Sequence, residues 1–225
     1  IMVPKVGKAA DIYAIDMLVT QASAAVGRKK RYGLEVIIET VLGLTNVNEI
    51  AGSSPRLESL HFGSADYAAS AGMRTTNIGG GNTDYVMLTD KDDKGARERH
   101  WNDLWHYATA RIANACRAFG LLPIDGPFSG IRDTEGLRAA AKRAAALGFE
   151  GKMAIHPSQI EIIHEVMTPS AGQIAWANEV IEAMAAAERE GRGAVKDKNG
   201  EMIDLMHIKV AKKLLDRAAR IGGKQ

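Results

Sequence analysis

Short apolar runs alternate with longer segments of helical periodicity through most of the chain. The runs have the length and the Val, Ile and Leu content of buried β-strands, and they lie at residues 1–6, 35–39, 60–63, 121–125 and 152–156. Between them, apolar residues recur at three- and four-residue steps, which predicts helices at 12–26, 103–119 and 134–147. This order predicts parallel βαβ units with right-handed connections, and therefore an α/β fold.

The C-terminal part of the sequence follows a different pattern. Its expected elements are a helix at 171–190, an Asn199-Gly200 turn of hairpin type and a helix at 206–221. No further strand–helix unit is predicted there. We therefore expect two domains, an α/β part at residues 1–170 and an appendage at residues 171–225.

Residues 72–99 interrupt the alternation with a long, polar, glycine-rich segment. Its Gly79-Gly80-Gly81-Asn82 run invites a phosphate-loop interpretation. The run lacks the Gly-Lys-Ser/Thr ending, however, and does not directly follow a predicted strand. A loop of this length and composition is more typical of a mobile lid or rim, and that is what we expect.

Composition narrows the class of protein. With 46% hydrophobic and 25% charged residues, the 225-residue chain has the balance of an ordinary globular protein. Its formal net charge of +2 gives no reason to expect a nucleic-acid partner. We also expect no membrane association, because the sequence has no run of eighteen apolar residues. The single Cys116 excludes an internal disulfide framework and fits a cytoplasmic location.

Polar residues close the predicted strands, where the active sites of parallel α/β proteins lie. They are Lys5, Glu39, Asp66, Asp125 and His156. Glu39 and Asp66 terminate successive strands, which in a barrel lie about 4.8 Å apart. Carboxylates that close repel each other unless a cation or a shared proton lies between them. Two oxygen ligands with positions left for water and substrate suit Mg²⁺.

Spacing alone leaves simpler roles open for these residues. Glu39 can cap a nearby helix, and Asp66 can be a helix N-cap. Asp125 is a candidate partner of the metal ligands rather than a ligand. His156 is more typical of a packed, hydrogen-bonded histidine. The Gly63-Ser64-Ala65-Asp66 turn offers main-chain N–H groups to an anion.

An ordered series of motifs then resembles the malyl-CoA/β-methylmalyl-CoA lyases of the citrate lyase β-subunit-like (HpcH/HpaI aldolase) family. The resemblance covers nearly the whole chain. Its motifs are Met2-Val3-Pro4-Lys5-Val6, Glu39-Thr40 with Gly43 and Asn46, Phe62-Gly63-Ser64-Ala65-Asp66, Arg74 to Gly81, Trp105-His106-Tyr107, Ile124-Asp125-Gly126-Pro127-Phe128 and Gly151 to Pro157.

This resemblance implies a TIM (β/α)₈ barrel and a reversible carbon–carbon lyase. The substrates would be (S)-malyl-CoA, cleaved to acetyl-CoA and glyoxylate, and β-methylmalyl-CoA, cleaved to propionyl-CoA and glyoxylate. Glu39 and Asp66 would hold Mg²⁺, with Mn²⁺ as the alternative ion. Main-chain groups of Gly63, Ser64, Ala65 and Asp66 would bind the substrate carboxylate. Lys5, Asp125 and His156 would contact the ligands rather than the metal.

The resemblance also implies that the catalytic base comes from a neighbouring subunit. The matching position is Asp204 in the C-terminal appendage, which would act as a lid on the neighbouring barrel. On sequence alone, Asp204 would equally pass as the N-cap of the last predicted helix. The implied assembly is a homo-oligomer built from trimers, a hexamer.

The sequence departs from the family pattern at its N-terminus. Family members begin with three further strand–helix units, which carry a substrate-contacting Arg and part of the CoA site. Ile1 matches the start of the fourth strand. A barrel lacking three strands would expose two parallel edges, so we expect this chain to be a fragment. Two other functions stay open: a malyl-CoA thioesterase, and a citrate-lyase-like subunit that acts on another acyl thioester.

Overall fold

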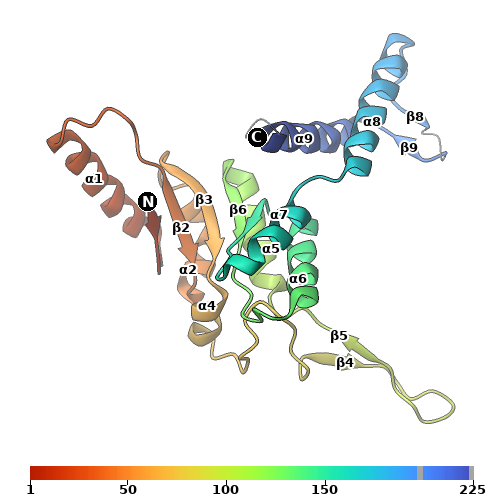
Figure 1. The fold of residues 1–225 in the computed structure, drawn as a ribbon, viewed down its shortest axis with the longest axis horizontal. Coiled ribbons are helices and arrows are strands. Elements are labelled where there is room, and N and C mark those ends of the chain that lie inside the picture. The colour runs from red at the N-terminus through yellow and green to blue at the C-terminus, as the bar shows by residue number, and fades with distance from the viewer. Residues whose placement is uncertain (197–199, 223–225) are drawn as a thin grey trace. The chain divides into compact units, whose positions relative to one another are not determined.

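The structure is a computed structural model that describes residues 1–196 and 200–222 (Figure 1). The chain divides into two compact units, Ile1–Met167 and Thr168–Gln225, and each is described by itself. Among the described residues, no helix combines the length and the apolar character needed to cross a membrane.

A five-stranded parallel sheet forms the centre of the first unit. Its strands, in spatial order, are β1 (Met2–Val3), β2 (Leu34–Ile38), β3 (Leu57–Phe62), β6 (Leu122–Asp125) and β7 (Gly151–Lys152). All neighbouring pairs run parallel, with Ile38 opposite Phe62 and His61 opposite Ile124. The parallel sheet confirms the predicted α/β class.

Helices connect these strands, and several begin or end at residues that are common at helix ends. They are α1 (Ala9–Ala25), α2 (Val41–Thr45), α3 (Val47–Ala51), α4 (Ser64–Ser70), α5 (His106–Phe119), α6 (Thr134–Ala146), the 3₁₀ turn η1 (Pro157–Gln159) and α7 (Ile160–Met167). Thr40 caps α2 and Asp133 caps α6 through their side-chain oxygens. Gly120 ends α5 at a positive φ of 74°, a conformation that glycine adopts without strain.

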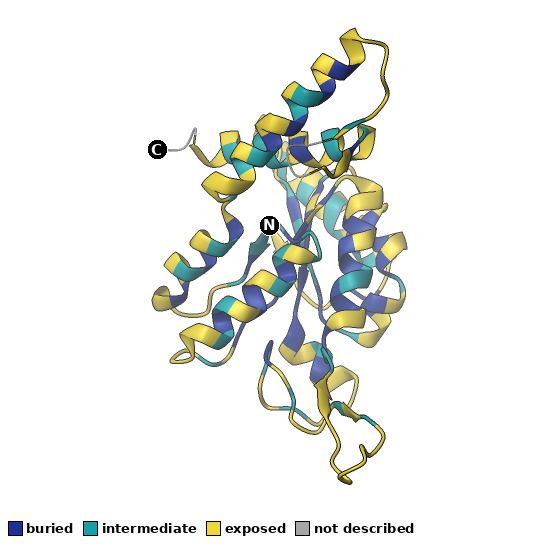
Figure 2. Cartoon of the chain, turned by 90° about the vertical axis from the view of Figure 1, so that its right-hand side faces the viewer, coloured by how far each residue is buried: buried dark blue, intermediate teal, exposed yellow. Residues whose placement is uncertain are grey.

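One face of the sheet packs on helices to form the core. Leu34, Val36 and Ile38 alternate along β2 and are buried, and Leu60 and Phe62 of β3 belong to the same cluster. Figure 2 shows buried strands flanked by helices whose inner sides are buried. Because side chains alternate along a strand, residues between these positions face the other way. That second face carries the polar side chains of Glu35, Ser59 and His61.

The first and last strands are shorter than the sequence predicts. β1 ends at Val3, and Lys5 adopts a left-handed backbone conformation with φ 55°, which no strand accommodates. β7 ends at Lys152, because the Ile155 N–H donates to Gln159 Oε1 at 2.9 Å rather than to a neighbouring strand. The prediction that His156 ends a strand is therefore wrong.

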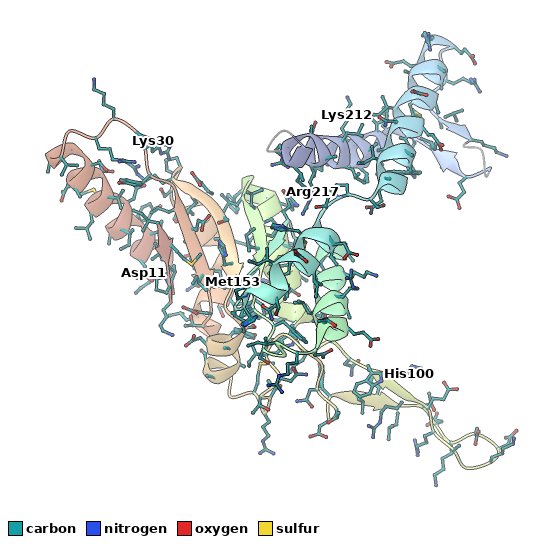
Figure 3. All side chains as sticks on the ribbon, viewed as in Figure 1. Asp11, Lys30, His100, Met153, Lys212 and Arg217 are labelled. Atoms are coloured by element: carbon teal, nitrogen blue, oxygen red, sulfur yellow. The ribbon has the colours of Figure 1, made fainter. Side chains whose placement is uncertain are left out.

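The glycine-rich segment leads into an antiparallel hairpin that its sequence pattern does not predict. β4 (Val86–Leu88) pairs with β5 (Arg99–Trp101), and the hairpin extends away from the parallel sheet (Figure 1). His100 lies on it, with its imidazole in solvent (Figure 3). Met87 and Trp101 are exposed as well. The segment therefore contains a regular hairpin, and its expected role as a lid or rim stays a prediction.

The second unit is a helical pair with a short hairpin. Its elements are α8 (Ala171–Arg189), β8 (Val195–Lys196), β9 (Met202–Ile203) and α9 (Leu205–Gly222). Ala177, Val180, Met184, Ile203 and Ala211 form its core. β8 and β9 pair antiparallel, as the predicted hairpin requires, although Asn199 of the predicted turn lies outside the described residues. The two predicted helices are confirmed.

Candidate metal and substrate site

The carboxyl ends of β2 and β3 carry the two predicted metal ligands. Glu39 directly follows β2 and is buried, and Asp66 lies half-exposed in the first turn of α4. Lys5 contacts both of them. Its main-chain N–H donates to Glu39 Oε1 at 2.8 Å, and its ammonium donates to Asp66 Oδ1 at 2.5 Å. The structure therefore brings both carboxylates to one residue, and a positive charge lies on one of them.

Lys5 reaches the two carboxylates through an unusual backbone. Its φ of 55° is the one positive value of a non-glycine residue in the part of the chain that the structure describes. Such a conformation costs a non-glycine residue roughly 1–2 kcal/mol. The hydrogen bond that the Lys5 ammonium donates to Asp66 raises the pKa of that ammonium. Backbone strain and a charged hydrogen bond coincide at this residue, which is a pattern of functional sites.

Gly63 lets the two strand ends come this close. A Cβ added at Gly63 would lie 2.3 Å from Glu39 Cβ and 2.7 Å from Glu39 Oε2, well inside van der Waals contact. The Gly63 N–H also donates to the Ile38 carbonyl at 3.0 Å, which continues the β2–β3 pairing past the strand end. Glycine at position 63 is thus required by the position of the Glu39 side chain.

Ser64 has unused hydrogen-bonding capacity at the start of α4. Its side chain is fully buried, and among the described residues its hydroxyl has no hydrogen-bond partner. Ser64 lines a small cavity together with Phe62, Trp105 and Asp125. The first N–H groups of a helix also lack partners within the helix. The Ser64-Ala65-Asp66 turn can therefore donate several hydrogen bonds.

Asp125 forms a buried ion pair with Lys152. The Lys152 ammonium donates to Asp125 Oδ2 at 2.6 Å and to the Gly126 carbonyl at 2.7 Å. The two side chains are 1% (Lys152) and 11% (Asp125) exposed. A charge buried to this extent needs a partner of opposite sign. Asp125 is thus neutralised by its neighbour on β7.

His156 lies in solvent and caps the 3₁₀ turn η1. Its Nδ1 accepts from the Ser158 N–H at 3.2 Å and lies 2.8 Å from Ser158 Oγ. The hydrogen-bonded histidine that the sequence suggests is present, but it is exposed rather than packed. The contacts of His156 therefore stabilise the start of η1.

Asp204 lies in the second unit, directly before α9. Its Oδ1 accepts from the Met206 N–H at 2.9 Å, as the N-cap interpretation predicts, and lies 2.9 Å from His207 Nδ1. The hydrogen bond with His207 lowers the pKa of the Asp204 carboxyl below its usual range. Asp204 is therefore an ionised, half-exposed carboxylate with a histidine beside it.

The donor set at the strand ends suits Mg²⁺. Both carboxylates contact Lys5, Glu39 through the main-chain N–H and Asp66 through the ammonium, so a positive charge already lies at this position. Within the described ranges, no group of three or more His, Cys, Asp or Glu side chains could hold a metal ion. A metal held by two carboxylates and completed by water or substrate oxygens is the arrangement that Mg²⁺ prefers, whereas zinc selects His and Cys.

Comparison with known proteins places the chain in a family. The family model of HpcH/HpaI aldolase/citrate lyase matches residues 1–157. The chain belongs to the HpcH/HpaI aldolase/citrate lyase family. That match includes Lys5, Glu39 and Asp66, and the citrate lyase-like family resemblance that the motifs indicate is thereby confirmed.

Individual members of the HpcH/HpaI family are similar over most of this chain. The L-malyl-CoA/beta-methylmalyl-CoA lyase of Rhodobacter capsulatus is 50% identical, over 97% of this chain and 66% of the relative. A (3S)-malyl-CoA thioesterase of Cereibacter sphaeroides is 34% identical, over 98% of this chain and 65% of the relative. The structure of CitE from Mycobacterium tuberculosis was solved with magnesium, acetoacetate and coenzyme A. It matches this chain with a TM-score of 0.66 at 29% identity, over 97% of this chain and 67% of CitE. The chain spans about two thirds of the length of the curated relatives it matches.

The sequence of this HpcH/HpaI family chain does not predict the roles of two residues near the site. Lys152 is one, and its signal is a lone lysine inside an apolar strand, where only a buried partner would stabilise it. His61 is the other. Its Nε2 lies 3.0 Å from Ser59 Oγ and 3.5 Å from Glu35 Oε2, while its buried Nδ1 has no hydrogen-bond partner among the described residues. No motif marked His61.

Proposed function

We propose that the protein is a Mg²⁺-dependent carbon–carbon lyase that cleaves (S)-malyl-CoA to acetyl-CoA and glyoxylate, or β-methylmalyl-CoA to propionyl-CoA and glyoxylate. The observation that carries the proposal is that Glu39 and Asp66, past the ends of neighbouring parallel strands, both contact one residue, Lys5. The Rhodobacter capsulatus relative, identical at half of the aligned positions, supports the choice of substrates.

Glu39 and Asp66 would hold the metal through carboxylate oxygens. When bound, Mg²⁺ acts as a Lewis acid that polarises the glyoxylate aldehyde and stabilises the developing alkoxide. Magnesium in the M. tuberculosis CitE structure supports this ion, and Mn²⁺ is the alternative that the same oxygen donors would accept. Gly63 keeps the Glu39 side chain close to the start of α4, where the substrate carboxylate would lie.

The turn from Gly63 to Asp66 would bind the substrate carboxylate. The N–H groups of Ser64, Ala65 and Asp66 open α4 and have no acceptors within the helix. The buried Ser64 hydroxyl adds a further donor at the same turn. Lys5 is the cation beside this turn. Asp125 forms an ion pair with Lys152, and His156 caps the 3₁₀ turn η1.

Asp204 is the proposed base. A thioester is a poor carbon acid, so forming its enolate needs a carboxylate placed at the α-carbon. In the synthetic direction Asp204 removes the α-proton, and in cleavage it returns a proton to the enolate carbon. Its lowered pKa keeps the Asp204 carboxyl ionised, the form in which a base acts. We further propose that Asp204 serves the metal site of a neighbouring copy in a hexamer built from trimers, with the second unit as a lid.

The parallel sheet would be part of a (β/α)₈ barrel in a cytoplasmic enzyme. The face of the sheet that carries Glu35, Ser59 and His61 would point into the barrel, and the opposite face packs on helices. In such barrels the active site lies where Glu39 and Asp66 lie, at the carboxyl ends of the strands.

Product analysis with three variants tests the proposal. Glu39→Gln and Asp66→Asn should each lower malyl-CoA cleavage at least about a hundredfold, since each removes a charged metal ligand. Glu49→Gln, an exposed acid on α3, is the control and should leave activity unchanged. If both variants cleaved malyl-CoA with unchanged Mg²⁺ dependence, Glu39 and Asp66 would not be the metal ligands.

The products also separate the lyase from its alternatives. Glyoxylate with acetyl-CoA identifies the lyase, whereas malate with free CoA identifies a thioesterase like the Cereibacter sphaeroides relative. A protein that turns over no free CoA thioester would be a carrier-associated subunit. Mixing Asp204→Ala with Asp66→Asn tests the shared site, because partial recovery of activity requires that Asp204 acts on another copy.

A further inference from the structure

Lys5 makes two contacts of different kinds at the candidate metal site. The first comes from the main chain, where its N–H holds Glu39 Oε1 at 2.8 Å. The second comes from the end of the side chain, where its ammonium holds Asp66 Oδ1 at 2.5 Å. The main-chain contact is fixed by the left-handed backbone of Lys5, whereas the ammonium contact depends on a flexible four-carbon side chain.

The ammonium contact is exchangeable because it lies in solvent. The Lys5 side chain is 61% exposed and the Asp66 side chain 53% exposed. An exposed ion pair contributes little to stability, so releasing it costs little. The ammonium can therefore leave Asp66 without disturbing the Glu39 contact.

The two cations compete for the same carboxylates. Without a positive charge, Glu39 and Asp66 would repel each other, and the Lys5 ammonium, 2.5 Å from Asp66 Oδ1, offsets this repulsion. A divalent ion at the same carboxylates is itself repelled by an ammonium a few ångströms away. Binding of the metal is therefore favoured when the ammonium moves into solvent.

We propose that Lys5 is a resident counter-cation that occupies Asp66 until Mg²⁺ enters, and that it thereby sets the Mg²⁺ concentration at which the site fills. This inference rests on the proposed function, because it takes Glu39 and Asp66 as the metal ligands. It assigns Lys5 a positioning role through its main chain and a competing role through its ammonium. The left-handed backbone of Lys5 keeps its N–H on Glu39 when the ammonium leaves Asp66.

Calorimetric titration of the full-length protein with Mg²⁺ tests this role without relying on activity. Lys5→Met removes the ammonium but keeps the main-chain N–H and the length of the side chain. It should bind Mg²⁺ at least about tenfold more tightly than the wild type. Lys30→Met, in the exposed loop between α1 and β2, is the matched control and should bind like the wild type (Figure 3).

A second variant keeps the inference testable if Lys5→Met does not fold. Lys5→Arg should bind Mg²⁺ more weakly than the wild type, because a guanidinium holds a carboxylate through two hydrogen bonds. Unchanged or weaker binding by Lys5→Met, or tighter binding by Lys5→Arg, would overturn the competing role. A wild-type protein that binds no Mg²⁺ would instead contradict the proposed function on which the inference rests.

Discussion

Two lysine–aspartate pairs lie at the carboxyl end of the same parallel sheet, and their surroundings differ sharply. Lys152 and Asp125 are buried on neighbouring strands, and Lys152 also holds the Gly126 carbonyl. Lys5 and Asp66 meet in solvent, and Lys5 adopts a strained backbone to reach its partners. The buried pair has no room to exchange partners, whereas the exposed pair can open. The difference separates a structural ion pair from a site that can accept another cation.

The largest expected effect comes from breaking the buried pair. Lys152→Met should lower the free energy of unfolding by about 3–5 kcal/mol, because Asp125 then stays buried with an uncompensated charge. Lys5→Met is the matched comparison and should shift the urea midpoint far less. The double variant Asp125→Asn/Lys152→Met should recover part of the loss. Equal destabilisation by Lys152→Met and Lys5→Met would erase the distinction between the two pairs.

A smaller effect should follow from crowding the exposed site. Gly63→Ala places a Cβ against Glu39 and should lower the free energy of unfolding by about 1–3 kcal/mol, while weakening Mg²⁺ binding as the carboxylate shifts. Gly81→Ala is the control, since no atom lies within 4 Å of a Cβ added there. Urea unfolding and calorimetry measure the two effects. If Gly63→Ala matched Gly81→Ala in both, Glu39 would not be held by contact with Gly63.

The smallest effect should appear on the polar face of the sheet as the pH falls. Burial lowers the pKa of His61 below its ordinary value of 6.5, and Glu35 offsets this only in part. The unfolded chain therefore binds more protons than the folded one, so stability is lost as the pH drops below about 6.5. His61→Asn should show a shallower loss than the wild type between about pH 7 and about pH 5 in urea unfolding, and the exposed His164→Asn should not. A wild-type slope in His61→Asn would argue that His61 protonates freely.

The sequence predicts what depends on local pattern. The strands β2, β3 and β6 follow from their β-branched and leucine-rich runs. Glu39 directly follows β2 and Asp66 lies in the first turn of the helix after β3, which is why the sequence places them near each other. The helices of the second unit follow in the same way, from their three- and four-residue apolar periodicity.

Long-range contacts explain what the sequence could not supply. The β7 strand is cut short by a side chain, Gln159, whose partner only the fold reveals. The two strands of the β4–β5 hairpin have three residues each, which is too short to show an alternating pattern. The role of Lys152 could be predicted only by knowing that Asp125 lies beside it. The positive φ of Lys5 accompanies contacts with two residues far along the chain, Glu39 and Asp66.

Metal binding by the two carboxylates is the central claim, and titration with Mn²⁺ followed by electron paramagnetic resonance tests it most directly. The full-length wild type and Glu49→Gln should bind one Mn²⁺ per chain, which added Mg²⁺ displaces. Glu39→Gln and Asp66→Asn should each weaken that binding at least about tenfold, as loss of a metal ligand requires. Wild-type Mn²⁺ affinity in both Glu39→Gln and Asp66→Asn would contradict the account.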